Sequence, residues 1–250
     1  MADEELAGSQ PNPNGFFADV ANAQACSVAV AVRIRPLIGK ELRNGDKIVV
    51  EAREEDNQIV MGADRVFTFD KTFGIDSQQE VVFDTCVKNL VLGCFVGYNA
   101  TILAYGQTGS GKTFTMGSGY TIGVKEEDLG IIPRVIRMIF EEREARRSKA
   151  EVIIKCSFLE IYNEEFHDLL ERNMSSSTMV NQIMPQKKEI SIREEKNGTI
   201  SVFGLKEMTV NSAEEMAGCL DMGSSQRVTA CTLMNSSSSR SHGIFTISIE

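Results

Sequence analysis

Residues 101–113 read Thr-Ile-Leu-Ala-Tyr-Gly-Gln-Thr-Gly-Ser-Gly-Lys-Thr, and the rest of the chain can be interpreted around this stretch. The apolar run Thr101–Tyr105 predicts a buried strand. It leads directly into Gly106–Thr113, which fits the phosphate-binding loop pattern G-x-x-x-x-G-K-[ST]. The glycines of this pattern let successive backbone N–H groups turn toward an anion. A strand that enters such a loop predicts an α/β fold with a nucleotide at the carboxyl end of the strand.

The side chains of this loop are expected to bind different parts of a nucleotide. Lys112 would reach the outer phosphates, and the hydroxyl of Thr113 would ligate magnesium. Residues 114–116 can open a helix whose positive end faces the same anion. The alternative is a glycine-rich turn that happens to carry a lysine. The predicted phosphate contacts are Gly106, Gln107, Thr108, Gly109, Ser110, Gly111, Lys112 and Thr113.

The composition predicts an intracellular α/β domain and argues against several other classes. The chain has 250 residues, 42% of them apolar, which is enough for one large core. Its net charge of −9 argues against nucleic-acid binding through overall charge. The six cysteines form no C-x-x-C pair and there are two histidines, so neither a disulfide framework nor a zinc site is expected. We expect no membrane span and no signal peptide.

Hydrophobic periodicity predicts strands and helices in alternation. Residues 1–24 are polar and are interpreted as a flexible leader before one domain at 25–250. Capping boxes at Ser77–Glu80 and Ser212–Glu215 mark two helix starts. A strand buried on both faces is expected at 27–32. The other predicted elements are a small antiparallel patch at 47–50, 58–61 and 65–69, strands at 151–161 and 244–249, a hairpin of 189–193 with 199–203, helices at 77–91, 131–147 and 212–227, a short amphipathic segment at 163–170, and loops at 117–130 and 173–188.

A serine-rich segment follows the last predicted helix. Residues 235–242 read Asn-Ser-Ser-Ser-Ser-Arg-Ser-His. Taken alone, it is typical of a floppy loop. Beside a phosphate loop, its hydroxyls are suitable magnesium ligands and can orient a water, and its arginine can hold the charge that develops on a γ-phosphate. The pattern Asn-x-x-Ser-Ser-Arg-Ser-His resembles the first switch loop of the kinesins.

The resemblance to the kinesin motor domain runs along almost the whole chain after residue 26. Arg33–Pro36 resembles the adenine-side motif of that family. Residues 127–133 and the sequence of the phosphate loop resemble the chromokinesin branch most. The resemblance implies an α/β phosphate-loop NTPase with a mostly parallel or mixed central sheet flanked by helices. Further segments typical of the family are 67–70, 97–101, 104–108, 158–164 and 169–170.

The resemblance also implies the ligands, ATP or ADP with Mg²⁺, and the residues that hold them. Arg33, Arg35 and Pro36 would border the adenine, and Phe114 would stack on it. The magnesium-side hydroxyls would be those of Thr113 and Ser239. Asn235 and Ser238 would place the γ-phosphate and the attacking water. Arg240 would pair with the second switch.

The second switch is not in this sequence. The kinesin pattern Asp-Leu-Ala-Gly-Ser-Glu, expected shortly after Ile249, does not occur in it. The resemblance therefore covers roughly the first two thirds of a motor domain, and the sheet is expected to be incomplete at the C-terminus. In kinesins the two strands that follow insert on either side of the phosphate-loop strand. Thr101–Tyr105 is then expected to lack neighbours within residues 1–250, and turnover by this chain alone is expected to be lost.

The function that the resemblance implies is an ATP-dependent microtubule motor. Its partner would be tubulin, with no nucleic acid or membrane, and its place the cytoplasmic microtubule cytoskeleton, including the spindle. Oligomeric state would be set by regions outside this sequence. One alternative is another phosphate-loop enzyme, either a myosin-like motor, whose switch resembles Ser-Ser-Arg-Phe-Gly-Lys, or a small-molecule kinase. The other is a non-catalytic interaction fragment. ATPase measurements with and without microtubules separate the three.

Overall fold

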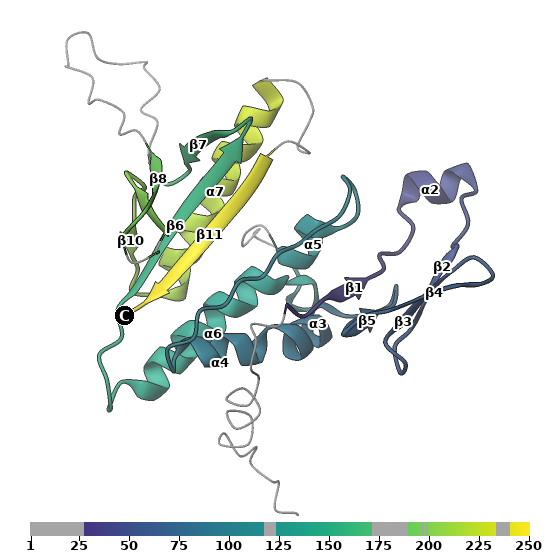
Figure 1. Ribbon diagram of the computed structural model, residues 1–250, viewed down its shortest axis with the longest axis horizontal. Coiled ribbons are helices and arrows are strands. Elements are labelled where there is room, and N and C mark those ends of the chain that lie inside the picture. Colours follow the sequence, from purple (N-terminus) through teal and green to yellow (C-terminus); the bar gives the residue numbers. More distant parts are fainter. Residues whose placement is uncertain (1–27, 118–123, 172–189, 197, 199, 234–240) are drawn as a thin grey trace, which may run out of the picture. The chain divides into compact units, whose positions relative to one another are not determined.

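The computed structural model describes residues 28–117, 124–171, 190–196, 198, 200–233 and 241–250 (Figure 1). The chain divides into two compact units, Met1–Gly74 and Ile75–Glu250, and each is described by itself. The predicted leader at 1–24 lies outside the described residues, and the single domain predicted at 25–250 stays a prediction.

The first unit contains the predicted antiparallel patch. β3 (Gln58–Met61) pairs on one edge with β2 (Val50–Arg53) and on the other with β4 (Arg65–Thr68). Ile59 and Val60 are adjacent in β3 and lie on opposite faces of the sheet, and both are buried. This confirms the prediction of three short antiparallel strands, although β2 begins a few residues later than the sequence pattern indicated.

The strand predicted at 27–32 is shorter and more exposed than expected. β1 (Ala31–Arg33) pairs in parallel with β5 (Lys71–Phe73). Val28 is 84% exposed and Val30 is 48% exposed, so the prediction of burial on both faces is wrong here. A parallel strand is buried on both faces only when strands flank it and helices cover it. Among the described residues of its unit, β1 has one strand neighbour.

The helix predicted from the first capping box is broken in two. α3 begins after Gln78, one residue later than the predicted box at Ser77, and Gln78 makes no side-chain cap hydrogen bond. α3 and α4 meet at Val87, where φ is −119°. Phe83, Val87 and Val91 are buried at helical spacing, as their apolar pattern predicted. The helices in the described part of the chain are α2 (Gly39–Asn44), α3 (Gln79–Cys86), α4 (Lys88–Cys94), α5 (Lys112–Met116), the 3₁₀ helix η1 (Glu126–Asp128), α6 (Ile131–Arg146) and α7 (Ala213–Leu233).

The other two predicted helices are confirmed. α6 has Pro133 in its first turn, where the missing N–H costs nothing, and it buries Ile136 and Ile139. At the start of α7, the hydroxyl oxygen of Ser212 accepts the backbone N–H of Glu215 at 3.2 Å. The Glu215 carboxylate in turn accepts the backbone N–H of Asn211 at 2.7 Å. The Ser212 half of the predicted capping box is therefore formed, while the Glu215 carboxylate binds the amide one residue before the N-cap, and α7 extends beyond its predicted end.

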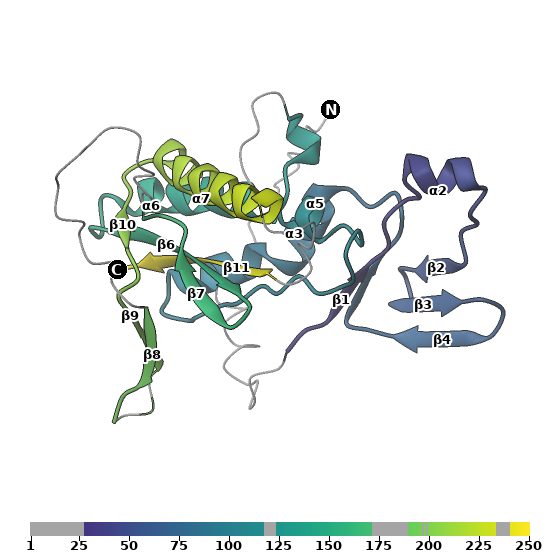
Figure 2. The same cartoon turned by 90° about the horizontal axis from the view of Figure 1, so that it is seen from above.

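The main sheet of the second unit is built around β6 (Ile154–Tyr162). β11 (Ser241–Ile249) pairs antiparallel along its whole length, from Ser241 opposite Tyr162 to Ile249 opposite Ile154. β7 (Glu165–Asp168) and β10 (Met208–Thr209) also pair antiparallel with β6. α7 runs along this sheet (Figure 2), and Gly223 of α7 approaches the ring of Phe158 so closely that an added Cβ would lie 2.3 Å from it.

The sequence pattern missed β7. The segment 163–170 was predicted only as amphipathic, yet β6 and β7 form a hairpin in which Tyr162 opposes Glu165. The two turn residues, Asn163 and Glu164, have φ values of 50° and 66°. Positive φ at both positions defines a type I′ turn, whose twist matches the flanking strands. Asn163 is the one local signal for this turn, because Glu164 is an unusual residue at positive φ.

The second hairpin was predicted correctly. β8 (Ser191–Glu194) pairs antiparallel with β9 (Ile200–Phe203), and the Arg193 guanidinium lies 5.1 Å from the centre of the Phe203 ring. In the part of the chain that the structure describes, β1–β5 is the one parallel pair, and the strands form four separate sheets. The expected mostly parallel or mixed central sheet is therefore not formed by these residues. None of the helices described is long and apolar enough to cross a membrane.

Candidate nucleotide-binding site

The predicted phosphate loop has a backbone that glycine alone adopts readily. Gly106, Gly109 and Gly111 have φ values of 151°, 83° and 97°. A Cβ on Gly106 would lie 2.6 Å from the Ser110 hydroxyl oxygen, so the loop closes tightly over this position. The loop enters α5 directly at Lys112. A close-turned loop of this kind suits a phosphate group, because glycine has no side chain and lets the backbone approach an anion closely.

Lys112 lies over the loop that precedes it. Its ammonium donates hydrogen bonds to the carbonyl oxygens of Gly106 at 2.6 Å and of Gln107 at 2.9 Å. The next residue, Thr113, is exposed in the first turn of α5. The chain thus presents an ammonium and a hydroxyl side by side at this loop, which is the donor set that a magnesium–nucleotide complex needs.

Phe114 has an accessible ring and an anchored backbone. Phe114 is 53% exposed, so one face of its ring can stack on a planar ligand. Its carbonyl oxygen accepts a hydrogen bond from the amide Nε2 of Gln79 at 2.7 Å. The sequence analysis named Phe114 and missed Gln79, whose signal is its position three residues before Val82 and four before Phe83, where the helical periodicity predicts an apolar residue.

The segment that leads into the loop is not the buried strand that the apolar run predicted. Thr101–Tyr105 has no regular secondary structure and no ladder partner among the described residues. Leu103 is 82% exposed and Tyr105 is 96% exposed. A strand needs neighbours to bury its side chains and pair its backbone. For the described residues, the result agrees with the expectation that this segment lacks strand neighbours.

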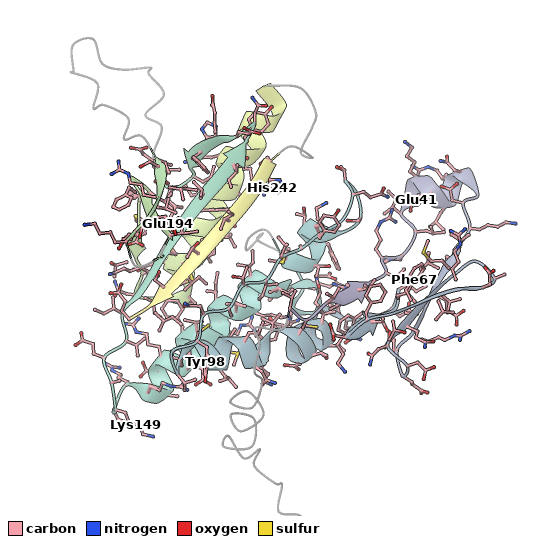
Figure 3. The ribbon with its side chains drawn as sticks, in the orientation of Figure 1. Glu41, Phe67, Tyr98, Lys149, Glu194 and His242 are labelled. Carbon is pink, nitrogen blue, oxygen red and sulfur yellow. The ribbon has the colours of Figure 1, made fainter. Side chains whose placement is uncertain are left out.

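The predicted adenine-side residues belong to the first unit, and the structure places them only within that unit. The guanidinium of Arg35 makes two hydrogen bonds, at 2.6 and 2.7 Å, to the carboxylate of Glu41 in α2 (Figure 3), and a third to the carbonyl oxygen of Pro36 at 2.8 Å. These bonds from Arg35, with the Ile38 N–H, lower the pKa of Glu41 to about 2. Arg33 is partly buried, and burial lowers the pKa of its guanidinium.

The predicted switch residues Asn235, Ser238, Ser239 and Arg240 lie outside the described residues. The first described residue after them, Ser241, is buried and firmly held. Arg227 donates to the Ser241 hydroxyl oxygen at 3.0 Å and to its carbonyl oxygen at 2.8 Å. The Ser241 hydroxyl donates to the buried carboxylate of Glu160, which also lies 3.4 Å from Arg227 Nε.

This cluster fixes one end of the serine-rich segment to the main sheet. Figure 3 shows the neighbouring residue, His242, at the start of β11. The sequence analysis did not single out Glu160 or Arg227 as site residues. The available signal was a glutamate in the middle of the apolar strand β6, since a buried carboxylate needs hydrogen-bond donors.

A tight glycine loop, the helix it enters and the lysine over it define a phosphate-loop nucleotide-binding fold of the α/β class. The family model described as Kinesin motor domain matches residues 33–250 of the chain. The chain therefore belongs to the kinesin motor domain family. The predicted fold class, an α/β phosphate-loop NTPase, is confirmed.

Several known proteins are similar to this chain. Kinesin-like protein KIF21B of Mus musculus is 44% identical over 230 residues, which cover 89% of this chain and 14% of that protein. Chromosome-associated kinesin KIF4 of Mus musculus is 46% identical over 224 residues, covering 89% of this chain and 17% of that protein. Kinesin-related protein 8 of Dictyostelium discoideum is 46% identical over 224 residues, covering 89% of this chain and 11% of that protein.

A solved structure is also similar. The one described as "Structure of a fast kinesin: Implications for ATPase mechanism and interactions with microtubules" matches with a TM-score of 0.77 and 34% identity, covering 89% of this chain and 59% of that chain. This chain thus spans between 11% and 17% of the length of the three curated relatives named above.

Proposed function

We propose that this chain binds ATP or ADP with Mg²⁺ and forms the nucleotide-binding part of a motor domain that hydrolyses ATP and moves along microtubules. The observation that carries the proposal is the tight loop at Gly106–Gly111 with the Lys112 ammonium over it, in a chain of the kinesin motor domain family. The similar fast kinesin is described by its ATPase mechanism and its interactions with microtubules, which supports the same activity here.

The phosphate loop would act through its backbone and two side chains. Lys112 would exchange the carbonyl oxygens of Gly106 and Gln107 for phosphate oxygens, because an ionised acceptor makes a stronger bond to an ammonium than a neutral carbonyl does. The hydroxyls of Thr113 and Ser239 would hold Mg²⁺. When bound, this ion supplies positive charge beside the phosphates.

The remaining predicted residues would act at the two ends of the nucleotide. On the adenine side, Phe114 would stack on the base, and Arg33 and Pro36 would border it. Arg35 would contribute as the residue that the Glu41 carboxylate holds in place. On the γ-phosphate side, the serine-rich segment would place the phosphate and the water through Asn235 and Ser238, with Arg240 available to pair with a second switch.

The partner and the place in the cell follow from the family. We infer that microtubules are the partner and that the protein acts on the cytoplasmic cytoskeleton, including the spindle, without direct contact to nucleic acid or membrane. Residues 127–133 favour the chromokinesin branch. The sequence identity to the chromosome-associated kinesin KIF4 is 46%, and that to KIF27 of Homo sapiens is also 46%. The chromokinesin assignment therefore rests on the amino acids at positions 127–133.

Family membership bears on one of the two alternative functions, and an activity measurement bears on the other. Membership of the kinesin motor domain family disfavours a myosin-like motor or a small-molecule kinase. A fragment that keeps the fold without turnover is separated from a working motor by steady-state ATPase activity with and without microtubules.

The central experiment measures nucleotide affinity in the wild type, in Lys112→Ala and in the control Lys149→Ala. Loss of a charge-assisted bond costs about 1.5–3 kcal/mol, so Lys112→Ala should weaken MgATP and MgADP about 10- to 150-fold. Lys149 is exposed in the loop after α6, and its loss should leave the affinity unchanged. Equal affinity in all three proteins would contradict the proposed site.

A further inference from the structure

The helix that follows the phosphate loop is too short to hold its own shape. α5 has 5 residues, among them Lys112 and Thr113. Isolated helices of this length do not form in water, because nucleation is unfavourable and the gain per residue is small. The last carbonyl groups of a helix also lack partners within it. The positions of Lys112 and Thr113 therefore depend on what holds the far end of α5.

One side chain from another helix holds that end. Gln79, the first residue of α3, is 3% exposed. Its Nε2 donates to the carbonyl oxygen of Phe114 at 2.7 Å and to the carbonyl oxygen of Asp128 at 3.2 Å. Both partners are acceptors, so the nitrogen of the amide must face them, and its two hydrogens satisfy both at once. A single amide thus links the end of α5 to the end of η1.

The element on the other side of this link is itself fixed. Arg134 of α6 donates to the carbonyl oxygens of Leu129 at 2.9 Å and of Glu126 at 3.1 Å. The guanidinium of Arg137 forms an ion pair with the carboxylate of Glu126. η1 is therefore held on α6 by two arginines, and Gln79 ties α5 to this combined block.

A backbone contact lies at the same place. A Cβ built on Gly117 would lie 2.9 Å from the Cα of Gly130, and one built on Gly130 would lie 2.4 Å from the Gly117 nitrogen. The end of α5 and the start of α6 thus touch without room for a side chain. This contact limits how far apart the two ends can move, and the Gln79 amide sets the position of the α5 carbonyl relative to η1.

We propose that Gln79 is a positioning residue for nucleotide binding, which holds Lys112 and Thr113 in place by fixing the far end of α5. This inference rests on the proposed function of the loop at 106–113. Gln79 acts through the backbone of α5 and not through the base. Its loss should therefore weaken every ligand that the loop binds through phosphates, whereas loss of the Phe114 ring should weaken only ligands with a base.

The test compares Gln79→Met with Gln78→Met, a matched change at the exposed neighbouring residue. Methionine keeps the length of the side chain and removes the donor. The measurements are the affinities for MgATP and for magnesium with inorganic tripolyphosphate, at a temperature well below the melting temperature of each variant. Gln79→Met should weaken both ligands by a similar factor of about ten, and Gln78→Met should weaken neither. Unchanged affinity in folded Gln79→Met, or a loss confined to MgATP, would overturn the inference.

Two further measurements keep the outcome decisive. Gln79→Glu keeps one donor when the new carboxyl group is protonated, which burial favours. If Gln79→Met does not fold, Gln79→Glu should show a smaller loss that is again equal for both ligands, and no loss would refute the proposal. If the wild type binds neither ligand, the proposed function fails, and amide hydrogen exchange tests Gln79 alone. The amides of Thr115 and Gly117 should then exchange faster in Gln79→Met than in Gln78→Met, and equal rates would count against the link.

Discussion

Two apolar stretches of this chain, β6 and Thr101–Tyr105, have similar sequence character and opposite structural outcomes. β6 pairs with β11 along one edge and with β7 and β10 along the other, and Cys156 and Phe158 in it are buried. Thr101–Tyr105 has no strand partner among the described residues and leaves Leu103 almost fully exposed. A local preference for β structure is thus expressed only where other strands complete the ladder.

The comparison separates what the phosphate loop needs from what its strand needs. The positive φ values of Gly106, Gly109 and Gly111 are present although the preceding segment is unpaired. Glycine positions and the Lys112 bonds to loop carbonyls are local, whereas burial of Leu103 and Tyr105 depends on distant parts of a chain. The local geometry of the loop can be tested by ligand binding, and the burial of Leu103 and Tyr105 by measurements of stability.

The largest expected effect comes from giving Thr101–Tyr105 strand neighbours. We predict that residues 1–250 alone melt broadly and show little ATPase activity, and that a form extended by the next two strands of a kinesin motor domain melts sharply and responds to microtubules. The reason is that Leu103 and Tyr105 remain in water, where each large apolar side chain forgoes about 1.5–3 kcal/mol of burial, against a total domain stability of about 5–15 kcal/mol. Calorimetry and ATPase rates on both forms decide it. A sharp melt with stimulated turnover in the shorter form would show that the neighbours are dispensable.

A pair of alanine substitutions measures the same difference at single residues. Ile154 in β6 is 1% exposed, so Ile154→Ala should lower the free energy of unfolding by about 2–5 kcal/mol. Leu103→Ala should change it by no more than about 0.5 kcal/mol, as is usual for exposed positions. Urea unfolding of the two variants beside the wild type gives both numbers. Comparable losses would mean that Thr101–Tyr105 is buried in solution.

The next test asks whether the loop and its helix bind nucleotide as the geometry suggests. Phe114→Ala should weaken MgATP by about 1–3 kcal/mol, by analogy with the stacking of bases on aromatic rings. In a complete motor domain that carries these residues, turnover at saturating ATP should change little, because stacking is equal in the ground and transition states. Titration of nucleotide together with KM and kcat checks this. A lower kcat with unchanged KM would place Phe114 in the chemistry and not under the base.

The smallest effect on stability is expected in the segment between β1 and α2. There the ion pair of Arg35 with Glu41, and not a strand pairing, connects the backbone segments. The pKa of Glu41 falls from 4.5 to about 2, chiefly through its hydrogen bonds from Arg35. A lowered pKa in the folded state contributes stability above pH 4.5 that is lost as the pH falls from 4.5 toward 2. The urea midpoint should therefore decrease over this range in the wild type, and less so in Glu41→Gln.

The matched control for this pH dependence is Glu55→Gln, at an exposed glutamate of the same unit. Its midpoint should follow the wild type. If Glu41→Gln also follows the wild type across the whole range, the ion pair with Arg35 does not stabilise the fold.

Motifs whose chemistry is local were readable in the sequence. The phosphate loop, the capping box at Ser212 and the hairpin of β8 with β9 were predicted because each depends on a few adjacent residues with defined backbone preferences. The family assignment followed from ordered motifs and is confirmed by the match to residues 33–250. The assignments of Asn235, Ser238, Ser239 and Arg240 stay predictions, because these residues lie outside those that the structure describes.

Features that depend on long-range contacts could not be read in the same way. The burial of β1 was overestimated because the apolar pattern does not say how many strands lie beside it. Gln79 and the pair of Glu160 with Arg227 were missed as site residues, because their partners are distant in sequence. In both cases the usable hint was a polar residue at a position where the periodicity predicts an apolar one.

The contact of Gly117 with Gly130 has a consequence for how this protein can vary. The chain leaves the end of α5 and returns to the start of α6 at the same point. Because these two helix ends meet, the length of the segment between them does not set the distance from α5 to α6. We therefore expect residues added between Gly117 and η1 to leave α5 and α6 in place. This segment is also a suitable place for a peptide tag or a spectroscopic reporter beside the phosphate loop.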